Sequence, residues 1–471
     1  MSFSSILNIP PEKIGEIFRL NEHLDKKVWT ILGDTNKRVN GTLGFNGDEI
    51  ILKFTLQNQE AKEIMGFQEK ITSLGKNTRV TLLNSACVNS LENLLVTEEI
   101  SVSCSPNMAI LHNKEKPMPE TIHDLSCRIP GIGAWFDQDL LDFDYGTRGF
   151  TSKNQQIYHE IPIGDGRKII LQNTFVPDLD AKIINGEFKA HTESSVTIQY
   201  TRPKKGAPLD RLITILSYVE DFFNFIFPLP YSAHIFSSET SGKKFDHLYV
   251  IRSTNGKRYR LDDRLSTHDM LFKLSDVSNI NQVFYNWVGH YEKIHEIVET
   301  IILLRTTYLS DEVRFTLIIN ALESVHRRYF NHTNQTDKDY KDRLDRITSR
   351  LETKDARFVK EKLKYGNEIS LRQRLKEIID ICEKHGIKRP DEQLVDQVVN
   401  TRNYLTHGDK ELRPKTLGDF KIQQASNILA IYTKLVLLKI LGIKDDELKN
   451  IVDNSAQLRP YYEDRPGLHP Y

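Results

Sequence analysis

The chain has 471 residues, a length typical of two or three domains, and 39% of them are hydrophobic, enough for packed cores. Lysine plus arginine equal aspartate plus glutamate at 64 each. This balance disfavours a protein that coats long nucleic-acid duplexes, so any RNA contact must come from a local patch.

The four cysteines are Cys87, Cys104, Cys127 and Cys382, and none of them form a C-x-x-C pair. This spacing argues against a zinc ribbon and supplies no disulfide framework. We therefore expect buried free thiols in a reducing compartment.

No segment has the pattern of a targeting or membrane sequence. Residues 1–6 lack the basic and then apolar form of a signal peptide. The most apolar helical stretch, Ile428 to Ile443, is interrupted by Lys434 and Lys439. We expect a soluble cytoplasmic protein with no membrane partner.

Residues 1–275 are predicted to form a β-rich N-terminal domain. Alternating apolar and polar residues predict strands at 50–57 and 196–200, and the apolar run 169–171 predicts a more buried strand. Residues 212–226 have one apolar face and end before Pro228, which predicts a helix. Two-residue hairpin turns are predicted where a residue that tolerates positive φ precedes glycine. These pairs are Asn40-Gly41, Asn46-Gly47, Asp165-Gly166, Asn185-Gly186 and Asn255-Gly256.

Residues 279–450 are predicted to form an all-α bundle, so the fold class is α+β with two domains. The helix candidates are 279–307, 311–331, 336–364, 369–385, 391–407 and 416–443. Alternating charges over 340–364 indicate a solvated helix or helix pair. Residues 456–471 are predicted to form an irregular tail.

The candidate site lies at the end of helix 391–407. Leu394, Val395, Val398, Val399 and Leu405 form an apolar stripe, and at about 100° per residue Arg402 falls near its middle. Asn403 and His407 share one flank of the stripe, and Gly408 can end the helix.

A guanidinium on a buried face requires an anionic partner. Either a carboxylate of a neighbouring helix pairs with Arg402 as a structural ion pair, or the arginine faces a cleft and grips a phosphate. In the second interpretation His407 is the proton-transfer group.

Two E-x-x-H motifs, Glu292-x-x-His295 and Glu323-x-x-His326, are of the kind that holds a di-metal centre in helical bundles. Their helical phases point mostly away from the apolar stripes, so we expect no metal site. Glu323 and His326 instead lie where a neighbouring helix could be met, and one of them is a candidate to orient Arg402 or His407. The alternative is a plain surface pair.

The pattern R-N-x-x-x-H-G at the end of a late helix, followed by one long apolar helix, resembles the HEPN superfamily. The strand-rich domain in front, the segment 318–326 and the tail resemble its ApeA-like branch. The resemblance implies an endoribonuclease that needs no metal or other cofactor, acting in bacterial defence against phage. The expected substrate is single-stranded or loop RNA, cut by attack of its own 2′-OH.

The resemblance also implies roles for three residues. His407 would be the general acid/base, Arg402 would hold the phosphate and offset the charge of the transition state, and Asn403 would fix the geometry. The implied assembly is a homodimer or a higher homo-oligomer in which two motifs face each other, and a phage-derived trigger is a candidate partner. The alternative is a non-catalytic HEPN module whose β-rich domain recognises a ligand.

Overall fold

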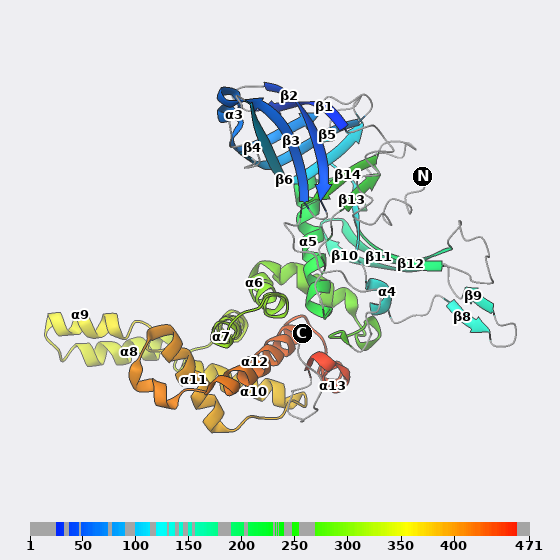
Figure 1. Cartoon of the computed structure of the whole chain (residues 1–471). Helices are drawn as coiled ribbons and strands as arrows, with labels where there is room; N and C mark the ends of the chain where they lie inside the picture. The colour runs from blue at the N-terminus through cyan, green and yellow to red at the C-terminus, as the bar shows by residue number, and fades with distance from the viewer. Residues whose placement is uncertain are drawn as a thin grey trace. The chain divides into compact units, whose positions relative to one another are not determined.

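The computed structural model describes residues 25–32, 37–46, 49–73, 78–89, 99–113, 119–129, 131–136, 141–144, 149–152, 156–177, 190–201, 206–228, 231, 233, 235–239, 247–253 and 269–458. The chain divides into two compact units, Met1–Thr267 and His268–Tyr471. The first is β-rich and the second is helical, so the predicted fold class is confirmed (Figure 1).

Six strands of the first unit close into an antiparallel barrel. They pair in the order β6-β3-β2-β1-β4-β5, and β5 also pairs with β6, which leaves no free edge. Alternate side chains point inward and are buried, Leu52 and Phe54 of the predicted strand 50–57 among them. The strands are β1 (Asp25–Leu32), β2 (Lys37–Asn46), β3 (Glu49–Gln57), β4 (Gly66–Ser73), β5 (Thr78–Asn89) and β6 (Glu99–Asn113).

The sheet continues beyond the barrel in the order β6-β14-β13-β7-β12-β11-β10. These strands are β7 (Asp124–Arg128), β10 (Gln156–Gly164), β11 (Arg167–Pro177), β12 (Ala190–Tyr200), β13 (Ile235–Glu239) and β14 (His247–Arg252). The predicted strands 169–171 and 196–200 lie in β11 and β12, and 169–171 is buried throughout. The predicted helix is α5 (Leu209–Ile226), which packs against β7 and β12.

The smaller elements of the first unit are α3 (Asn58–Ile64), α4 (Ile132–Trp135) and the separate hairpin of β8 (Leu141–Asp144) and β9 (Gly149–Ser152). A partly buried ion pair fixes α5 to the sheet, because Glu220 Oε2 accepts from Arg252 Nη2 of β14 at 2.7 Å. The same carboxylate accepts the backbone N–H of Ala233, so its charge is satisfied twice.

The predicted turns have different outcomes. Asp165 and Gly166 have φ of 53° and 70°, so this turn is confirmed. β2 and β3 pair as a hairpin, as predicted, but Asn46 is the last residue of β2 and pairs with Glu49, and Gly47 lies outside the described residues. The turn at Asn40-Gly41 is wrong, because both residues lie inside β2. The pairs 185–186 and 255–256 lie outside the described residues.

Gly41 is a glycine because two strands approach it closely. It pairs with Lys27 of β1 and Phe54 of β3, and a Cβ at this position would lie 2.9 Å from the backbone O of Lys53. A Cβ at Gly44, three residues along the same strand, would lie 3.9 Å from its nearest neighbour, the backbone O of Ile51. Sequence alone does not separate a glycine of this kind from a turn glycine.

We predict that Gly41→Ala lowers the free energy of unfolding by about 1–3 kcal/mol, since backbone must shift to admit the methyl group. Gly44→Ala is the matched control and should be neutral or slightly stabilising. Urea unfolding of both variants measures the difference, and equal stability of the two would contradict the close approach.

Two of the expected free thiols are bonded to each other. Cys87 of β5 and Cys104 of β6 are direct cross-strand partners and form a disulfide. The expectation of four free thiols is therefore wrong for this pair, because antiparallel pairing brings together residues that share no sequence motif. Cys127 and Cys382 are free and buried, and burial raises the pKa of both thiols.

The helical unit is arranged around α12, which packs against α7, α10 and α13. The helices are α6 (Ile280–Thr306), α7 (Asp311–Tyr329), α8 (Asp337–Thr348), α9 (Thr353–Lys362), α10 (Leu371–Lys384), α11 (Glu392–His407), α12 (Asp419–Ile440) and α13 (Asp445–Asn454). The charged segment is the helix pair α8–α9, and α13 is a helix that the periodicity did not predict.

The described part of this unit also contains three short 3-10 turns, Leu274–Asp276, Lys410–Lys415 and Ala456–Leu458. The second of these delays the start of α12 to Asp419, three residues after the predicted start. The predicted irregular tail, residues 456–471, begins with the turn Ala456–Leu458. Residues 459–471 lie outside the described part of the chain.

Lys434 interrupts the apolar surface of α12, as the sequence indicates. Its side chain is buried and its Nζ donates to Gln457 Oε1 at 3.0 Å. Burial lowers the pKa of Lys434 to about 7, and the nearby Arg305 cation acts in the same direction. Among the described helices, none combines the length and the hydropathy needed to cross a bilayer.

Candidate functional site

The helix that carries the predicted motif is fixed at both ends. At its start Asp391 Oδ1 accepts the backbone N–H of Leu394 at 2.6 Å. At its end Gly408 has φ of 68° and donates its N–H to Tyr404 O at 2.8 Å, which confirms the predicted glycine stop. Thr401 Oγ1 accepts the N–H of Leu417 at 2.9 Å and holds the following turn against α11.

Arg402 lies on the inner face of α11, as predicted, and its side chain is 23% exposed. Its Nη2 lies 3.3 Å from Glu323 Oε2 of α7, and its Nη1 donates to Asn403 Oδ1 at 3.2 Å. Its Nε is buried and has no hydrogen-bond partner. The arginine is therefore paired with a carboxylate, while its side chain is only partly buried.

His407 is exposed on the last turn of α11 and makes no hydrogen bond or ion pair with any described residue. It follows Arg402 by five positions, which places it about 140° around the helix. Within one chain the two side chains are therefore not brought together, although Asn403 contacts Arg402 directly.

Glu323 is shared between two arginines. Its Oε2 faces Arg402 at 3.3 Å, and its Oε1 accepts from Arg327 Nη2 at 3.0 Å. The Glu323 side chain is 13% exposed, so the carboxylate is shielded from water on most sides. The expected contact between this E-x-x-H motif and Arg402 is present, and it is made by Glu323.

His326 is fully buried, so it is not part of a surface pair. Its Nδ1 lies 3.1 Å from Arg374 Nη1, and its Nε2 lies 2.7 Å from Glu377 Oε2. Because a guanidinium only donates, Nδ1 must accept, and the ring proton sits on Nε2 and is donated to Glu377. Burial lowers the pKa of His326, and the hydrogen bond to Glu377 opposes this without outweighing it.

These side chains form one connected network that we call the charge ladder. Arg327 Nη1 donates to Glu368 Oε2 at 2.7 Å, and Arg374 Nη2 lies 3.7 Å from the same oxygen. At the far end His332 Nε2 lies 3.3 Å from Glu377 Oε1. In order along the network the ladder consists of Arg402, Glu323, Arg327, Glu368, Arg374, His326, Glu377 and His332.

Comparison with known families covers both units. The family model for ApeA N-terminal domain 1 matches residues 26–287, more than half of the chain, and the model for Apea-like HEPN matches residues 316–447. The chain belongs to the ApeA-like HEPN family of defence proteins. The HEPN match contains the whole charge ladder together with His407. Neither a curated protein nor a solved structure gives a significant match to the chain.

Five residues of the ladder in this HEPN bundle were missed by sequence reasoning. They are Arg327, His332, Glu368, Arg374 and Glu377. A signal for two of them was present: Arg327 and His332 have the same separation as Arg402 and His407, and a tyrosine is the third residue of each motif. Glu368, Arg374 and Glu377 carry no such signal, because they reach the network through tertiary contacts. Arg374 and Glu377 do so by the packing of α10 on α7, and Glu368 precedes α10 and forms a β-bridge with Thr333.

The metal-binding alternative finds no support in the arrangement of the HEPN bundle. Glu292 is exposed on α6, and Glu323 is held by two arginines. Among the described residues, no group of three or more His, Cys, Asp or Glu side chains is placed to hold a metal ion.

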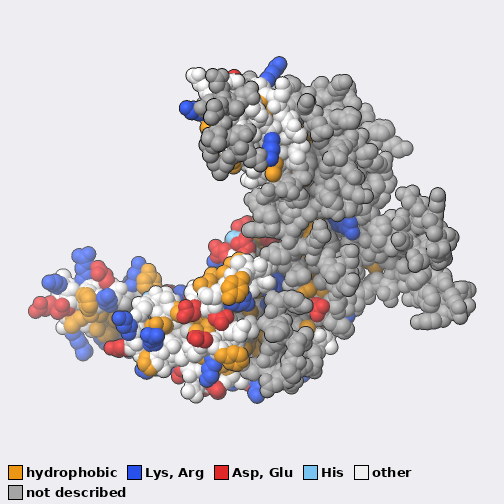
Figure 2. All heavy atoms as spheres, in the orientation of Figure 1, with side chains coloured by type: hydrophobic (Ala, Val, Ile, Leu, Met, Phe, Trp, Pro, Cys, Tyr) orange, Lys and Arg blue, Asp and Glu red, His pale blue; other side chains and the backbone are white. Residues whose placement is uncertain are grey.

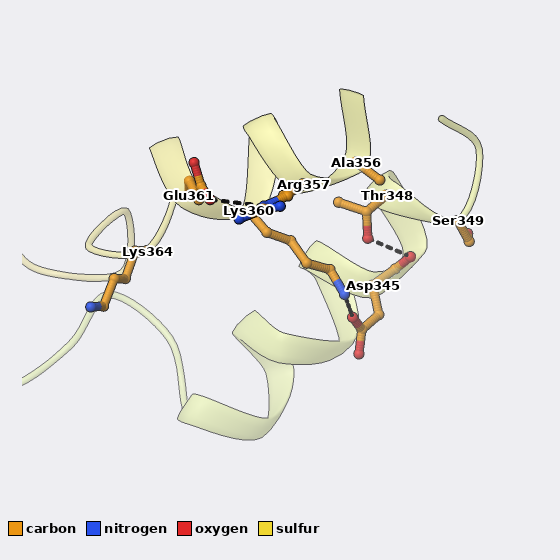
Figure 3. Close-up of a pocket in the computed structure, with 8 residues that line it drawn as sticks. All are labelled: Asp345, Thr348, Ser349, Ala356, Arg357, Lys360, Glu361 and Lys364. Carbon is orange, nitrogen blue, oxygen red and sulfur yellow. Dashed lines mark hydrogen bonds and ion pairs between the residues drawn. The ribbon is translucent and has the colours of Figure 1, made fainter. Parts of the chain in front are cut away.

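A second feature of the bundle is an open hollow between α8 and α9, away from the charge ladder (Figure 3). Lys360 Nζ crosses it to Asp345 Oδ1 at 2.9 Å, and Arg357 pairs with Glu361 on the adjoining turn. Large hydrophobic side chains are exposed on this helix pair and the turns next to it, among basic and acidic residues (Figure 2). These are Ile347, Leu351, Phe358, Leu363 and Tyr365.

We predict that the stability of the HEPN bundle falls as pH decreases below about 6.5 and that His326 contributes to the loss. With its pKa lowered in the folded state, the unfolded chain binds the additional proton first, so unfolding becomes easier as pH falls. His326→Gln retains an acceptor and a donor but does not titrate. Urea unfolding between pH 7 and pH 5 should therefore show a smaller loss of stability in the variant, whereas equal losses would exclude His326 as a source.

Proposed function

We propose that this chain is a metal-independent endoribonuclease that cuts single-stranded or loop RNA in defence against phage. The observation that carries the proposal is how few contacts hold the side chains of Arg402 and His407. Among the described residues, the polar contacts of the Arg402 guanidinium are those of 3.2 and 3.3 Å, and its side chain is 23% exposed, while His407 is exposed and has no hydrogen-bond or ion-pair partner. Membership of the HEPN family supports the same reaction class.

In the proposed reaction the 2′-OH of one nucleotide attacks the adjacent phosphorus. The bond to the 5′-oxygen of the next nucleotide breaks, so the products end in a 2′,3′-cyclic phosphate and a 5′-hydroxyl. His407 acts as general acid/base, and Arg402 leaves Glu323 to bind the phosphate and offset the charge that builds on it. Asn403 keeps the guanidinium in position through the hydrogen bond to its Nη1.

One imidazole cannot remove a proton from the 2′-OH and protonate the leaving oxygen in the same step. We therefore propose a homodimer in which the exposed ends of two α11 helices face each other and supply two His407 side chains. An unstacked RNA strand is required because the 2′-OH must lie in line with the scissile bond. The β-rich unit is proposed to sense the phage-derived trigger.

The alternative function is a non-catalytic HEPN module whose β-rich unit is a sensor. The contact between Arg402 and Glu323 favours it, since a structural ion pair needs no substrate. The two functions differ in one result, because a sensor produces no RNA cleavage either as the wild type or as a variant.

We predict that the full-length chain cleaves loop-containing RNA in EDTA and leaves 2′,3′-cyclic phosphate ends. His407→Ala should lower the rate by about 10²-fold or more, because a general acid/base is lost. Its thermal midpoint should stay near that of the wild type, since the side chain is exposed and makes no hydrogen bond or ion pair with the described residues.

Thr406→Ala is the matched control, since it changes the neighbouring exposed residue of the same helix end and should leave the rate unchanged. End-mapping of the RNA fragments gives the readout. Equal cleavage by the wild type and the His407 variant would contradict the proposed role.

A further inference from the structure

A second arginine and histidine lie beside the proposed site in the same chain. Arg327 is on the last turn of α7, and His332 follows the helix by three residues. Their spacing repeats that of Arg402 and His407. Both arginines contact the same carboxylate, one on each oxygen of Glu323. The arginines of the two motifs are therefore adjacent in space.

Arg327 keeps donors free for a further ligand. Its Nε and Nη2 contact Glu323, and its Nη1 donates to Glu368, which leaves one N–H on each terminal nitrogen of a group with five. The side chain is 47% exposed, twice the fraction of Arg402. A guanidinium with two free terminal N–H groups and access to solvent can bind phosphate oxygens as a fork.

His332 is the last member of the charge ladder and makes two polar contacts. Its Nδ1 lies 3.1 Å from the backbone O of Phe330, and its Nε2 faces Glu377 Oε1 at 3.3 Å. Both partners are acceptors, so either ring nitrogen can donate to its partner when it carries the proton. The side chain is 53% exposed.

We propose that Arg327 and His332 form a second phosphate-binding subsite, next to Arg402, for the backbone of a single-stranded RNA. The identification of the ligand as RNA rests on the proposed function. Glu323 occupies both arginines in the free protein, and successive phosphates of the strand replace it. Glu368 and Glu377 balance part of the local charge, so the subsite depends on the geometry of the arginine fork more than on net charge.

Binding of a fluorescent, single-stranded 2′-O-methyl oligonucleotide, which cannot be cut by 2′-OH attack, tests the subsite in the full-length chain. Arg327→Gln should weaken the affinity about tenfold and reduce the slope of log K against log salt by about 0.7, the value for one lost phosphate contact on a single strand. His332→Gln should weaken the affinity several-fold. Arg327→Lys keeps the charge and should restore the slope but only part of the affinity.

Arg372→Gln is the matched control. Arg372 is 46% exposed, has one ion pair, with Asp396, and lies on α10 outside the charge ladder, so its loss should leave binding and slope unchanged. Thermal midpoints of all variants show whether each variant still folds. If Arg327→Gln does not fold, the binding of Arg327→Lys tests the subsite instead. The proposal is overturned if Arg327→Gln and Arg372→Gln bind alike, or if the wild-type chain does not bind the oligonucleotide at about 50 mM salt.

The binding readout separates this inference from the proposed catalysis. A chain that binds through Arg327 but never cleaves RNA would support the subsite and refute the ribonuclease. A chain that cleaves RNA with unchanged affinity in Arg327→Gln would support the ribonuclease and refute the subsite.

Discussion

The site depends on one carboxylate that two arginines share. Glu323 is largely buried on α7 and lies between Arg402 of α11 and Arg327 of its own helix, so both guanidinium groups are held without being enclosed. Burial of a carboxylate costs free energy unless its charge is paired. Here two arginines each pair with part of the Glu323 carboxylate, whereas a single arginine in ideal geometry would close it to other ligands. Because both contacts are longer than the strongest charge-assisted hydrogen bonds, a phosphate can compete for either arginine.

The remainder of the charge ladder gives this arrangement its rigidity. Arg374 and His326 are buried almost completely, and the tautomer of His326 is set by the guanidinium on one side and Glu377 on the other. This buried half ties α10 to α7, while the exposed half presents Arg327 and His332 to solvent. This division is typical of a binding site, where the groups that position the site are buried and fixed and the groups that contact the ligand are exposed to solvent.

Features of this protein that local sequence patterns determine could be predicted, whereas most features that depend on long-range pairing could not. The end of α11 at Gly408 and the inward phase of Arg402 followed from helical periodicity and from the positive φ that glycine accepts. The closure of the barrel through β5 and β6 could not be predicted, and neither could the Cys87–Cys104 disulfide that this pairing creates, because strand partners are chosen by tertiary packing. Gly41 was misread for the same reason: the constraint comes from the backbone of a neighbouring strand. Helical phase placed Glu323 near Arg402, but Arg374 and Glu377 depend on how α10 packs against α7.

The central claim is that Glu323 holds the arginines only until a phosphate replaces it. The most direct measurement is the affinity of the full-length Glu323→Gln chain for the non-cleavable oligonucleotide, compared with the wild type at the same salt concentration. Removing a negative charge that competes with the phosphate should tighten binding about five- to tenfold, roughly 1 kcal/mol or slightly more. Unchanged or weaker binding would show that Glu323 belongs to a structural ion pair and would contradict the account.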